Sequence, residues 1–226
     1  MSGIAERLAH IQARVEQAAR AAGRDPKSVR LIAVSKKMPA EAIREAYDAG
    51  QRLFGENYAQ ELATKADALA DLSDIEWHFI GHLQSNKARL VAPRARVVHT
   101  VDGASLAKEL ARRAEAAGRT LDVLIEVNVS GEPQKHGIVA SELAEVLAGV
   151  RAFPPLSVRG LMTMPPEGDL DVAREVFETL ASLRNLHGGP GVLPELSMGM
   201  SGDFETAIAA GATIVRVGTA IFGART

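Results

Sequence analysis

Short apolar runs alternate with longer amphipathic stretches along nearly the whole chain, and this alternation limits the possible folds more than any other feature. Runs rich in Val and Ile with polar borders are typical of buried strands, and the stretches between them carry apolar residues at helical spacing. Because strands that alternate with helices pair in parallel, eight such units predict an α/β protein with a (β/α)8 barrel fold. The expected strands are residues 30–36, 52–55, 77–80, 97–101, 121–129, 156–162, 195–198 and 213–217.

The repeats follow one another without a linker rich in proline or serine. An open, doubly wound sheet is the alternative fold, but the absence of a long break favours closure. We therefore expect residues 1–226 to form a single barrel domain, with an extra helix packed on it within residues 1–24. The apolar stripe of that helix is Ile4, Leu8, Ile11, Val15 and Ala19.

Two helix starts are marked by acidic residues that can accept hydrogen bonds from backbone N–H groups. Asp102 is the expected N-cap of a helix at residues 105–117, and Asp169 or Asp171 is the expected N-cap of a later helix. The predicted buried stripe of that later helix is Val172, Val176, Leu180 and Leu183.

Composition excludes several classes of protein. The chain of 226 residues has no cysteine, which rules out disulfides and thiolate metal sites. Its formal net charge of −2 gives no electrostatic footprint for nucleic acid. It has no apolar run of membrane-spanning length and no signal-peptide core. We expect a cytoplasmic protein that binds neither membranes nor nucleic acid.

Lys36 is the first candidate for chemistry. It ends the apolar run that begins at Leu31, and side chains alternate along a strand, so Lys36 and Lys37 point to opposite faces. Two lysines that simply reach into water are the ordinary interpretation. In a barrel of this kind, however, reactive groups lie at the carboxyl ends of the strands.

Glycines and hydroxyl residues follow the last two predicted strands, where barrels commonly bind phosphate. Ser201 and Gly202 follow the seventh strand, and Gly218 and Thr219 follow the eighth. Glycine lets backbone N–H groups approach an anion, and hydroxyls donate hydrogen bonds. Asp203 and Glu205 would repel a phosphate unless they point outward.

Arg216 lies inside the eighth strand, where an unpaired charge is costly. It either forms a buried ion pair with a carboxylate such as Glu195 or Glu126, or faces a ligand nitrogen or anion. A strand-end lysine, a phosphate site and a guanidinium together suggest a phosphorylated carbonyl compound held as a Schiff base. A sugar phosphate and pyridoxal phosphate both fit that description.

Other candidates are weaker. His78 and His82 are four residues apart but straddle a strand and a glycine, so their side chains are not expected to converge on a metal. Lys135 lies in a polar loop and is expected to be a solvated lysine.

Seven sequence blocks, taken together, resemble the pyridoxal phosphate homeostasis protein family, whose barrel is related to the N-terminal domain of alanine racemase. The resemblance runs in order from about residue 5 to the end of the chain. The blocks are AVSK (33–36), FGENY (54–58), WHFIGHLQSNK (77–87), KHG (135–137), RGLMT (159–163), LSMGMSGD (196–203) and VRVGTAIFG (215–223).

The resemblance implies that pyridoxal 5′-phosphate is the cofactor and that Lys36 holds it as a Schiff base. It further implies that Asn57 lies beside the cofactor and that Arg216 faces the pyridine nitrogen. The phosphate would be held by Ser201, Gly202, Gly218 and Thr219. By the same resemblance we expect a monomer that maintains the intracellular supply of this cofactor (vitamin B6), with apo enzymes that use pyridoxal phosphate as possible recipients.

Two functions from different classes remain open besides an aldolase acting on a sugar phosphate. The first is a carrier that holds pyridoxal phosphate without substantial catalysis, and the second is an amino acid racemase. A two-base racemase needs a second proton carrier opposite the lysine, which alanine racemase takes from a tyrosine of an additional domain in its partner subunit. Because the sequence ends at Thr226, soon after the eighth strand, we expect no such domain and favour the carrier; Tyr58 is the tyrosine to watch.

Overall fold

Eight parallel strands close into a barrel in the part of the chain that the structure, a computed structural model, describes: residues 3–132 and 134–223. Each strand pairs with its neighbours in sequence, and β8 pairs with β1, where Val217 lies opposite Ala33. The predicted (β/α)8 fold is therefore confirmed. The strands are β1 Arg30–Val34, β2 Leu53–Glu56, β3 Glu76–Phe79, β4 Val97–Val101, β5 Leu121–Glu126, β6 Leu156–Met162, β7 Glu195–Ser197 and β8 Ile214–Val217.

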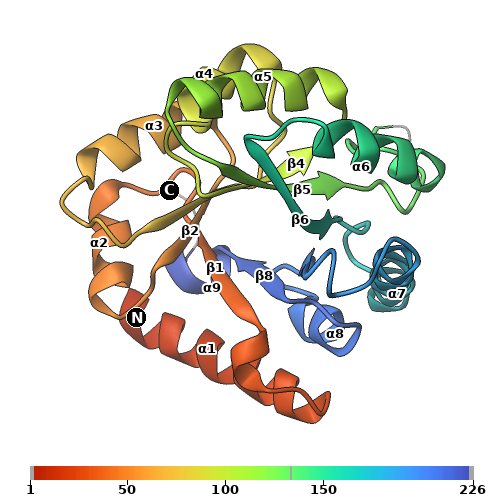
Figure 1. Cartoon of the computed structure of the whole chain (residues 1–226). Helices are drawn as coiled ribbons and strands as arrows, with labels where there is room; N and C mark the ends of the chain where they lie inside the picture. The colour runs from red at the N-terminus through yellow and green to blue at the C-terminus, as the bar shows by residue number, and fades with distance from the viewer. Residues whose placement is uncertain (1–2, 133, 224–226) are drawn as a thin grey trace.

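The helices surround the strands as an outer layer (Figure 1). The extra helix α1 (Ile4–Ala21) precedes the barrel, packs beside α2, α8 and α9, and buries all five residues of its predicted stripe. The other helices are α2 Ala40–Asp48, α3 Ala59–Ala68, α4 Ala88–Val91, α5 Ala104–Ala116, α6 Leu143–Arg151, α7 Leu170–Leu186, α8 Phe204–Ala209 and α9 Thr219–Phe222. Short 3-10 turns lie at Pro26–Ser28, Ser85–Lys87 and Ala140–Glu142.

One continuous apolar cluster joins the strands to the helices. It contains the large buried side chains of Phe54, Phe79, Phe177 and Phe204. Val97, Leu124 and Met162 on β4, β5 and β6 form a separate small cluster. Their neighbours in sequence, Val98, Val123 and Leu161, belong to the outer cluster. Because successive side chains of a strand point to opposite faces, the small cluster lies inside the barrel. The continuous outer core agrees with a single domain over residues 1–226, which stays a prediction.

Several predicted boundaries and caps are wrong for local reasons. β1 ends at Val34 rather than at residue 36, because the Ser35 carbonyl accepts from the Lys65 side chain instead of from a strand N–H group. β5 ends at Glu126 rather than at residue 129, because the chain turns back and Val127 forms an isolated bridge with Ile138.

The capping predictions had opposite outcomes. Asp169 caps α7, since its carboxylate accepts from the N–H groups of Asp171 and Val172. Asp102 does not cap α5: the N-cap is Gly103, and the Asp102 carboxylate lies 3.9 Å from the ring of His82. The buried stripe of α7 is also rotated from the predicted one; it is Ala173, Val176, Phe177 and Leu180, and Val172 is exposed.

Ion pairs close the amino end of the barrel. Arg30 pairs with Glu195 at 2.8 Å, and Arg96 pairs with Asp122 at 3.3 Å. A cavity of about 240 Å³ lies among these residues and is almost entirely polar in its lining. Because three cationic and three anionic residues line it, these charges balance one another, and we interpret the cavity as part of the ion-pair network at this end of the barrel rather than as an anion site.

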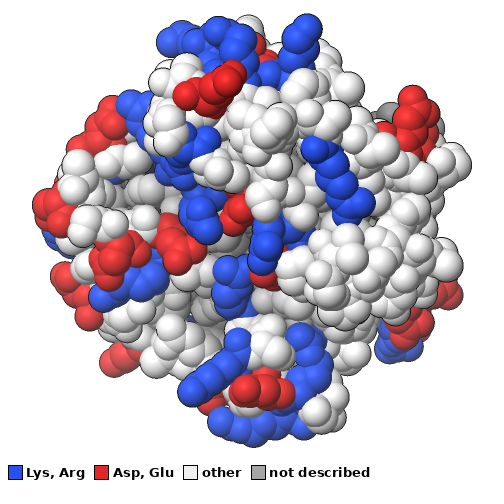
Figure 2. All heavy atoms as spheres, viewed as in Figure 1, with Lys and Arg blue, Asp and Glu red and all other residues white. Residues whose placement is uncertain are grey.

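The surface is electrostatically mixed. Figure 2 shows positive and negative side chains interspersed on the face that it presents, with neither sign forming a continuous patch across it. None of the described helices is long and apolar enough to cross a membrane.

Candidate functional site

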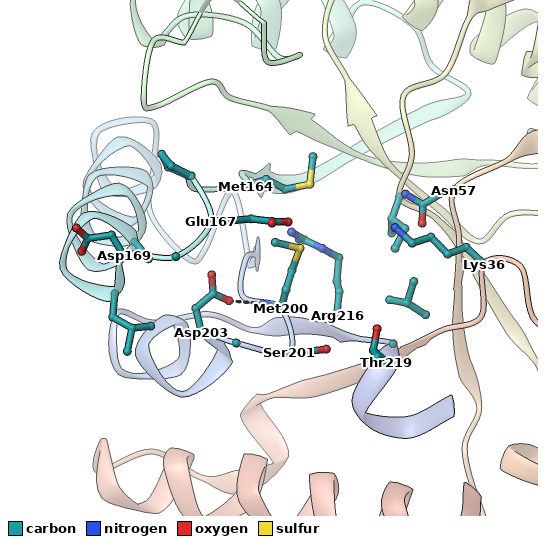
Figure 3. A pocket seen from close by; sticks show the side chains of 18 residues that line it. Lys36, Asn57, Met164, Glu167, Asp169, Met200, Ser201, Asp203, Arg216 and Thr219 are labelled. Carbon is teal, nitrogen blue, oxygen red and sulfur yellow. Dashed lines mark hydrogen bonds between the residues drawn. The ribbon is translucent and has the colours of Figure 1, made fainter. Parts of the chain in front are cut away.

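A cavity of about 500 Å³ opens at the carboxyl ends of the strands and brings all seven predicted site residues together. Figure 3 shows Lys36 beside Asn57 on one side of this cavity, Arg216 in its middle, and Ser201 and Thr219 along one edge. The seven residues that converge on the cavity are Lys36, Asn57, Ser201, Gly202, Arg216, Gly218 and Thr219.

Lys36 stands on a rigid turn between β1 and α2. The Ser35 N–H donates to the carbonyl of Gly55 at 2.9 Å, and the Ser35 hydroxyl donates to the Glu56 carboxylate at 2.6 Å. Lys37 follows with a φ of 62°, which a non-glycine residue adopts only at some cost. Its N–H is held by the Glu61 carboxylate at 2.7 Å. The turn therefore directs Lys36 into the cavity and leaves Lys37 exposed; the predicted separation holds, but it comes from this turn and not from strand alternation.

The buried side chain of Lys65 stabilises this turn through hydrogen bonds. Lys65 of α3 donates at 2.8 Å to each of three acceptors: the Ser35 carbonyl, the Glu56 carboxylate and the Glu61 carboxylate. Burial raises the pKa of Glu56, with the Lys65 ammonium opposing that shift. For Glu61, burial alone would raise the pKa, but bonds from Lys65 and the Lys37 N–H lower it.

Arg216 is buried in β8, and neutral groups hold it. Its Nη1 donates to the Ser197 hydroxyl at 2.6 Å, and its Nη2 donates to the Thr163 carbonyl at 3.1 Å. Burial lowers its pKa to about 10, while the carboxylates of Glu126 and Asp203 favour the charged form. Arg216 therefore stays charged at neutral pH and lines the cavity.

The ion pair considered for Arg216 is not formed. Glu195 pairs instead with Arg30 and accepts a hydrogen bond from Thr213. Glu126 makes no ion pair within the described part of the chain, and its Oε2 is buried without a hydrogen-bond partner there. Burial and the nearby Asp102 raise the Glu126 pKa to about 7.

The loops after β7 and β8 form the edge with Ser201 and Thr219. Gly199 has a φ of 95°, and a Cβ there would lie 2.6 Å from Ala207, so this turn requires glycine. At Gly218 a Cβ would meet the Val34 carbonyl at 3.1 Å, where β8 approaches β1 closely. The backbone of both loops is therefore close to the cavity, in the places the sequence predicted.

The two acidic residues in this region, which would repel a phosphate unless they point outward, differ in their placement. Glu205 does point outward and pairs with Arg14 of α1. Asp203, in contrast, lines the cavity, accepts from the Met200 N–H at 2.6 Å, and has its pKa raised by burial. A neutralised or hydrogen-bonded Asp203 repels an anion less than a free carboxylate would.

One wall of the cavity was not predicted. The loop between β6 and α7 contributes Met164 and Glu167 to it, and the first residue of α7, Leu170, completes it. Figure 3 shows Glu167 and Asp203 on the side away from Lys36. This loop also follows the carboxyl end of a strand, which is the signal that could have indicated it.

The remaining candidates lie elsewhere. His78 is inside the barrel and hydrogen-bonded to His99, whereas His82 is at the mouth, stacked on His136 with ring centroids 3.8 Å apart. Among the described residues no group of three or more potential ligands could hold a metal ion. Lys135 is less solvated than predicted, since it pairs with Glu132 and lies 3.5 Å from the carbonyl of Met164.

Comparison with known proteins shows the family to which the chain belongs. Residues 7–226 match the family described as alanine racemase, N-terminal domain. A curated relative from Pseudomonas aeruginosa, named pyridoxal phosphate homeostasis protein, is 48% identical over 100% of this chain and 97% of its own length. The chain belongs to the pyridoxal phosphate homeostasis protein family.

Solved structures of this family and of racemases share the fold. The structure of PipY from Synechococcus elongatus with PLP bound has a TM-score of 0.83 and is 41% identical, covering 97% of this chain and 100% of PipY. Alanine racemase from Corynebacterium glutamicum has a TM-score of 0.69 at 20% identity, covering 96% of this chain and 60% of the racemase, which shows a common barrel only.

Proposed function

We propose that this protein binds pyridoxal phosphate in the cavity at the carboxyl ends of the strands and holds it covalently through Lys36. The proposal rests on one observation: a lysine, a guanidinium and two loops with hydroxyls and backbone N–H groups converge on a single cavity of about 500 Å³. A relative of this family has been solved with PLP bound, which supports the assignment.

The residues present fit this cofactor on three counts. Ser201, Gly202, Gly218 and Thr219 can offer hydroxyl and backbone N–H donors to a phosphate. Arg216 can donate to a ring nitrogen, because its two described hydrogen bonds leave further N–H donors. The Asn57 Oδ1 is buried without a hydrogen-bond partner among the described residues, so a ligand group that donates to it would satisfy it.

When bound, pyridoxal phosphate supplies an aldehyde that condenses with primary amines and a ring that withdraws electrons. Among the described residues that line the cavity, Lys36 alone carries an amine, and it is the group that we assign to the aldehyde. Arg216 donates to the ring nitrogen and, being cationic, disfavours its protonation, which weakens the ring as an electron acceptor.

We propose further that the protein is a carrier with no substantial turnover of its own. Neither tyrosine nor histidine occurs among the described residues that line the cavity. Of the three carboxylates there, those of Asp169 and Asp203 accept bonds from backbone N–H groups, which leaves Glu167 as the acidic residue for experiment to test. Racemisation needs a second proton carrier opposite the lysine, and such a carrier contributes on the order of 10²- to 10⁴-fold in rate. The recipients that we propose are apo enzymes that use pyridoxal phosphate, and we expect the carrier to act as a monomer.

Borohydride reduction of the loaded protein, followed by peptide mapping, tests the covalent assignment. The pyridoxyl label should be on Lys36, and Lys36→Ala should lose both the label and the visible absorbance while remaining folded. A label chiefly on Lys37 or Lys135 would refute the assignment. Absence of any visible absorbance after incubation with the cofactor would favour an aldolase that uses the same lysine.

Pyridoxal without its phosphate tests the two loops. It should bind much more weakly than pyridoxal phosphate, and removing the Thr219 hydroxyl in Thr219→Val should cost about 1 to 3 kcal/mol of binding free energy. Equal binding of the two compounds would contradict the phosphate site.

Turnover is tested with a panel of L- and D-amino acids in deuterated water, following α-proton exchange and chirality. We expect slow residual exchange at most, together with recovery of activity when the loaded carrier is mixed with an apo enzyme that uses pyridoxal phosphate. Rapid racemisation that Tyr58→Phe or Glu167→Gln abolishes would establish the racemase alternative instead.

A further inference from the structure

A line of hydrogen bonds runs from Arg216 across the interior of the barrel, and the proposed function does not account for it. The Arg216 Nη1 is 2.6 Å from the Ser197 Oγ, and that oxygen is 2.9 Å from the His99 Nδ1. The His99 Nε2 is in turn 2.8 Å from the His78 Nδ1. All four residues are buried, and they come from β8, β7, β4 and β3. We call them the barrel chain.

The chemistry of arginine gives the barrel chain a direction. A guanidinium has only donors, so the Ser197 hydroxyl must accept from Arg216. If that hydroxyl then donates to the His99 Nδ1, His99 carries its proton on Nε2 and donates to the Nδ1 of His78. In the reverse orientation the hydroxyl would accept twice and its own proton would have no acceptor among the described residues, whereas the first orientation leaves the Nε2–H of His78 without one. Each orientation thus has one buried donor without a partner there, but the reverse one also leaves the lone pair of the His78 Nε2 unpaired, so the first orientation has one fewer unpaired buried group.

Electrostatics select the same direction. In the first orientation each neutral group presents its acceptor toward the guanidinium and its donor away from it. Burial lowers the pKa of His78 to about 3, and burial with the charges nearby lowers that of His99 well below its usual value. Both rings are therefore neutral at physiological pH, so the barrel chain holds Arg216 without cancelling its charge.

We infer that Ser197, His99 and His78 are positioning residues that aim the Arg216 guanidinium at the ring nitrogen of the ligand. This inference rests on the proposed function. It makes the cavity selective for aromatic aldehyde phosphates whose ring carries an unprotonated nitrogen, over rings with a C–H group at that position. Arg216 supplies the donor, and the barrel chain keeps the donor in place.

The proton positions can be measured in the protein without cofactor. Long-range ¹H–¹⁵N spectra of histidine-labelled protein at neutral pH should show His99 and His78 both neutral, each with its proton on Nε2. A proton on the Nδ1 of His99, or a charged ring at either position, would refute the hydrogen-bond direction assigned to the barrel chain. This result does not depend on whether pyridoxal phosphate binds, so it separates failure of this inference from failure of the proposed function.

Selectivity is measured by the ratio of affinities for pyridoxal phosphate and its 1-deaza analogue, which has a C–H group in place of the ring nitrogen. The wild type should prefer pyridoxal phosphate by about tenfold or more, as expected for one hydrogen bond from a charged donor. Ser197→Ala cuts the barrel chain next to Arg216 and should bring the ratio close to one. A variant that only loosens the fold would weaken both ligands alike and leave the ratio unchanged.

Three further variants make the test specific. Thr100→Val removes a different buried hydroxyl, which donates to the Gly81 carbonyl at 2.6 Å, and should keep the wild-type ratio. His99→Asn retains an acceptor for Ser197 and should keep most of the preference, whereas His99→Leu should lose it. The inference is refuted if the wild type does not discriminate between the ligands, if Ser197→Ala leaves the ratio unchanged, or if His99→Asn and His99→Leu behave alike.

Discussion

Two buried cations support the cavity, and they are held in opposite ways. Lys65 is surrounded by the carboxylates of Glu56 and Glu61 and by a backbone carbonyl. Arg216 is bonded to a hydroxyl and a carbonyl, and the carboxylates of Glu126 and Asp203 act on it only electrostatically, without a hydrogen bond among the described residues. A cation that is neutralised by its neighbours contributes to the fold, whereas a cation held by neutral groups keeps its charge for a ligand. The contrast predicts different consequences for their removal.

The largest expected effect is on stability, from Lys65→Met. This change leaves the buried Glu56 carboxylate without its cation, which typically costs about 3 to 5 kcal/mol. Urea denaturation of the cofactor-free protein measures the loss. Adding Glu56→Gln to Lys65→Met should restore part of it, because the uncompensated charge is then gone. The exposed pair of Arg112 and Glu109 is the matched control, and Arg112→Met should leave the midpoint unchanged.

Arg216→Met should have the opposite profile. Arg216 has no ion-pair partner among the described residues, so its removal separates no buried carboxylate from a paired cation and should cost less stability than Lys65→Met. Affinity for pyridoxal phosphate should fall by about 1.5 to 3 kcal/mol, the usual range for a hydrogen bond to a charged group. Arg30→Met, which breaks the pair with Glu195 at the other end of the barrel, should lower stability without changing affinity. If Arg216→Met is as destabilising as Lys65→Met, the contrast between the two cations is wrong.

The neutral histidines beside Arg216 should make the fold sensitive to acid. Above pH 6.5 His78 is neutral in both the folded and the unfolded chain, and it contributes no pH dependence. Below pH 6.5 the unfolded chain binds a proton that folded His78, with a pKa of about 3, does not. Stability should therefore fall by about 1.4 kcal/mol for each pH unit below 6.5.

Denaturation at pH 7.5 and pH 5.5 checks this expectation. His78→Phe should show a smaller difference between the two pH values than the wild type, about 1 to 2 kcal/mol less. His99 keeps part of the dependence, because burial lowers its pKa as well. An unchanged difference in His78→Phe would mean that folded His78 accepts a proton.

The smallest expected effect is that of Glu61→Gln. An amide oxygen can still accept from Lys65 and from the Lys37 N–H, so only the charge is lost. The side chain is about a third exposed, and we expect a loss of about 1 kcal/mol or less. Denaturation of Glu61→Gln and of Glu56→Gln should be compared, since the loss of stability should be larger for the fully buried Glu56 than for Glu61.

Much of the barrel and its cavity follows from local sequence signals. Alternation of strands and helices predicted the closed barrel, and the position of Lys36 at a strand end predicted its place at the cavity. The glycines and hydroxyl residues after the last two strands predicted the edge of the cavity that contains Ser201 and Thr219. These signals succeed because each depends on a residue's place along its own strand, which periodicity gives directly.

The partnerships across the barrel could not be predicted in the same way. His78 and His99 are 21 residues apart, and their contact depends on the stagger between β3 and β4. Glu56 and Lys65 meet because α3 packs over the end of β2, which no spacing rule indicates. The wrong cap at Asp102 has a similar origin, since the carboxylate lies toward His82 at the mouth instead of the helix start.

Two of the proposed cofactor contacts, Lys36 and Arg216, lie on either side of the seam where the first and last strands of the barrel meet. Lys36 follows β1, while Arg216 belongs to β8, which pairs with β1 through Arg30, Leu31, Ile32 and Ala33. During synthesis Lys36 therefore leaves the ribosome long before the groups assigned to the ring and the phosphate exist. A ligand that touches both sides of the seam can bind only after the barrel has closed, and its binding then stabilises the closed form. The supply of cofactor would in this way favour the finished chain over any unfinished one.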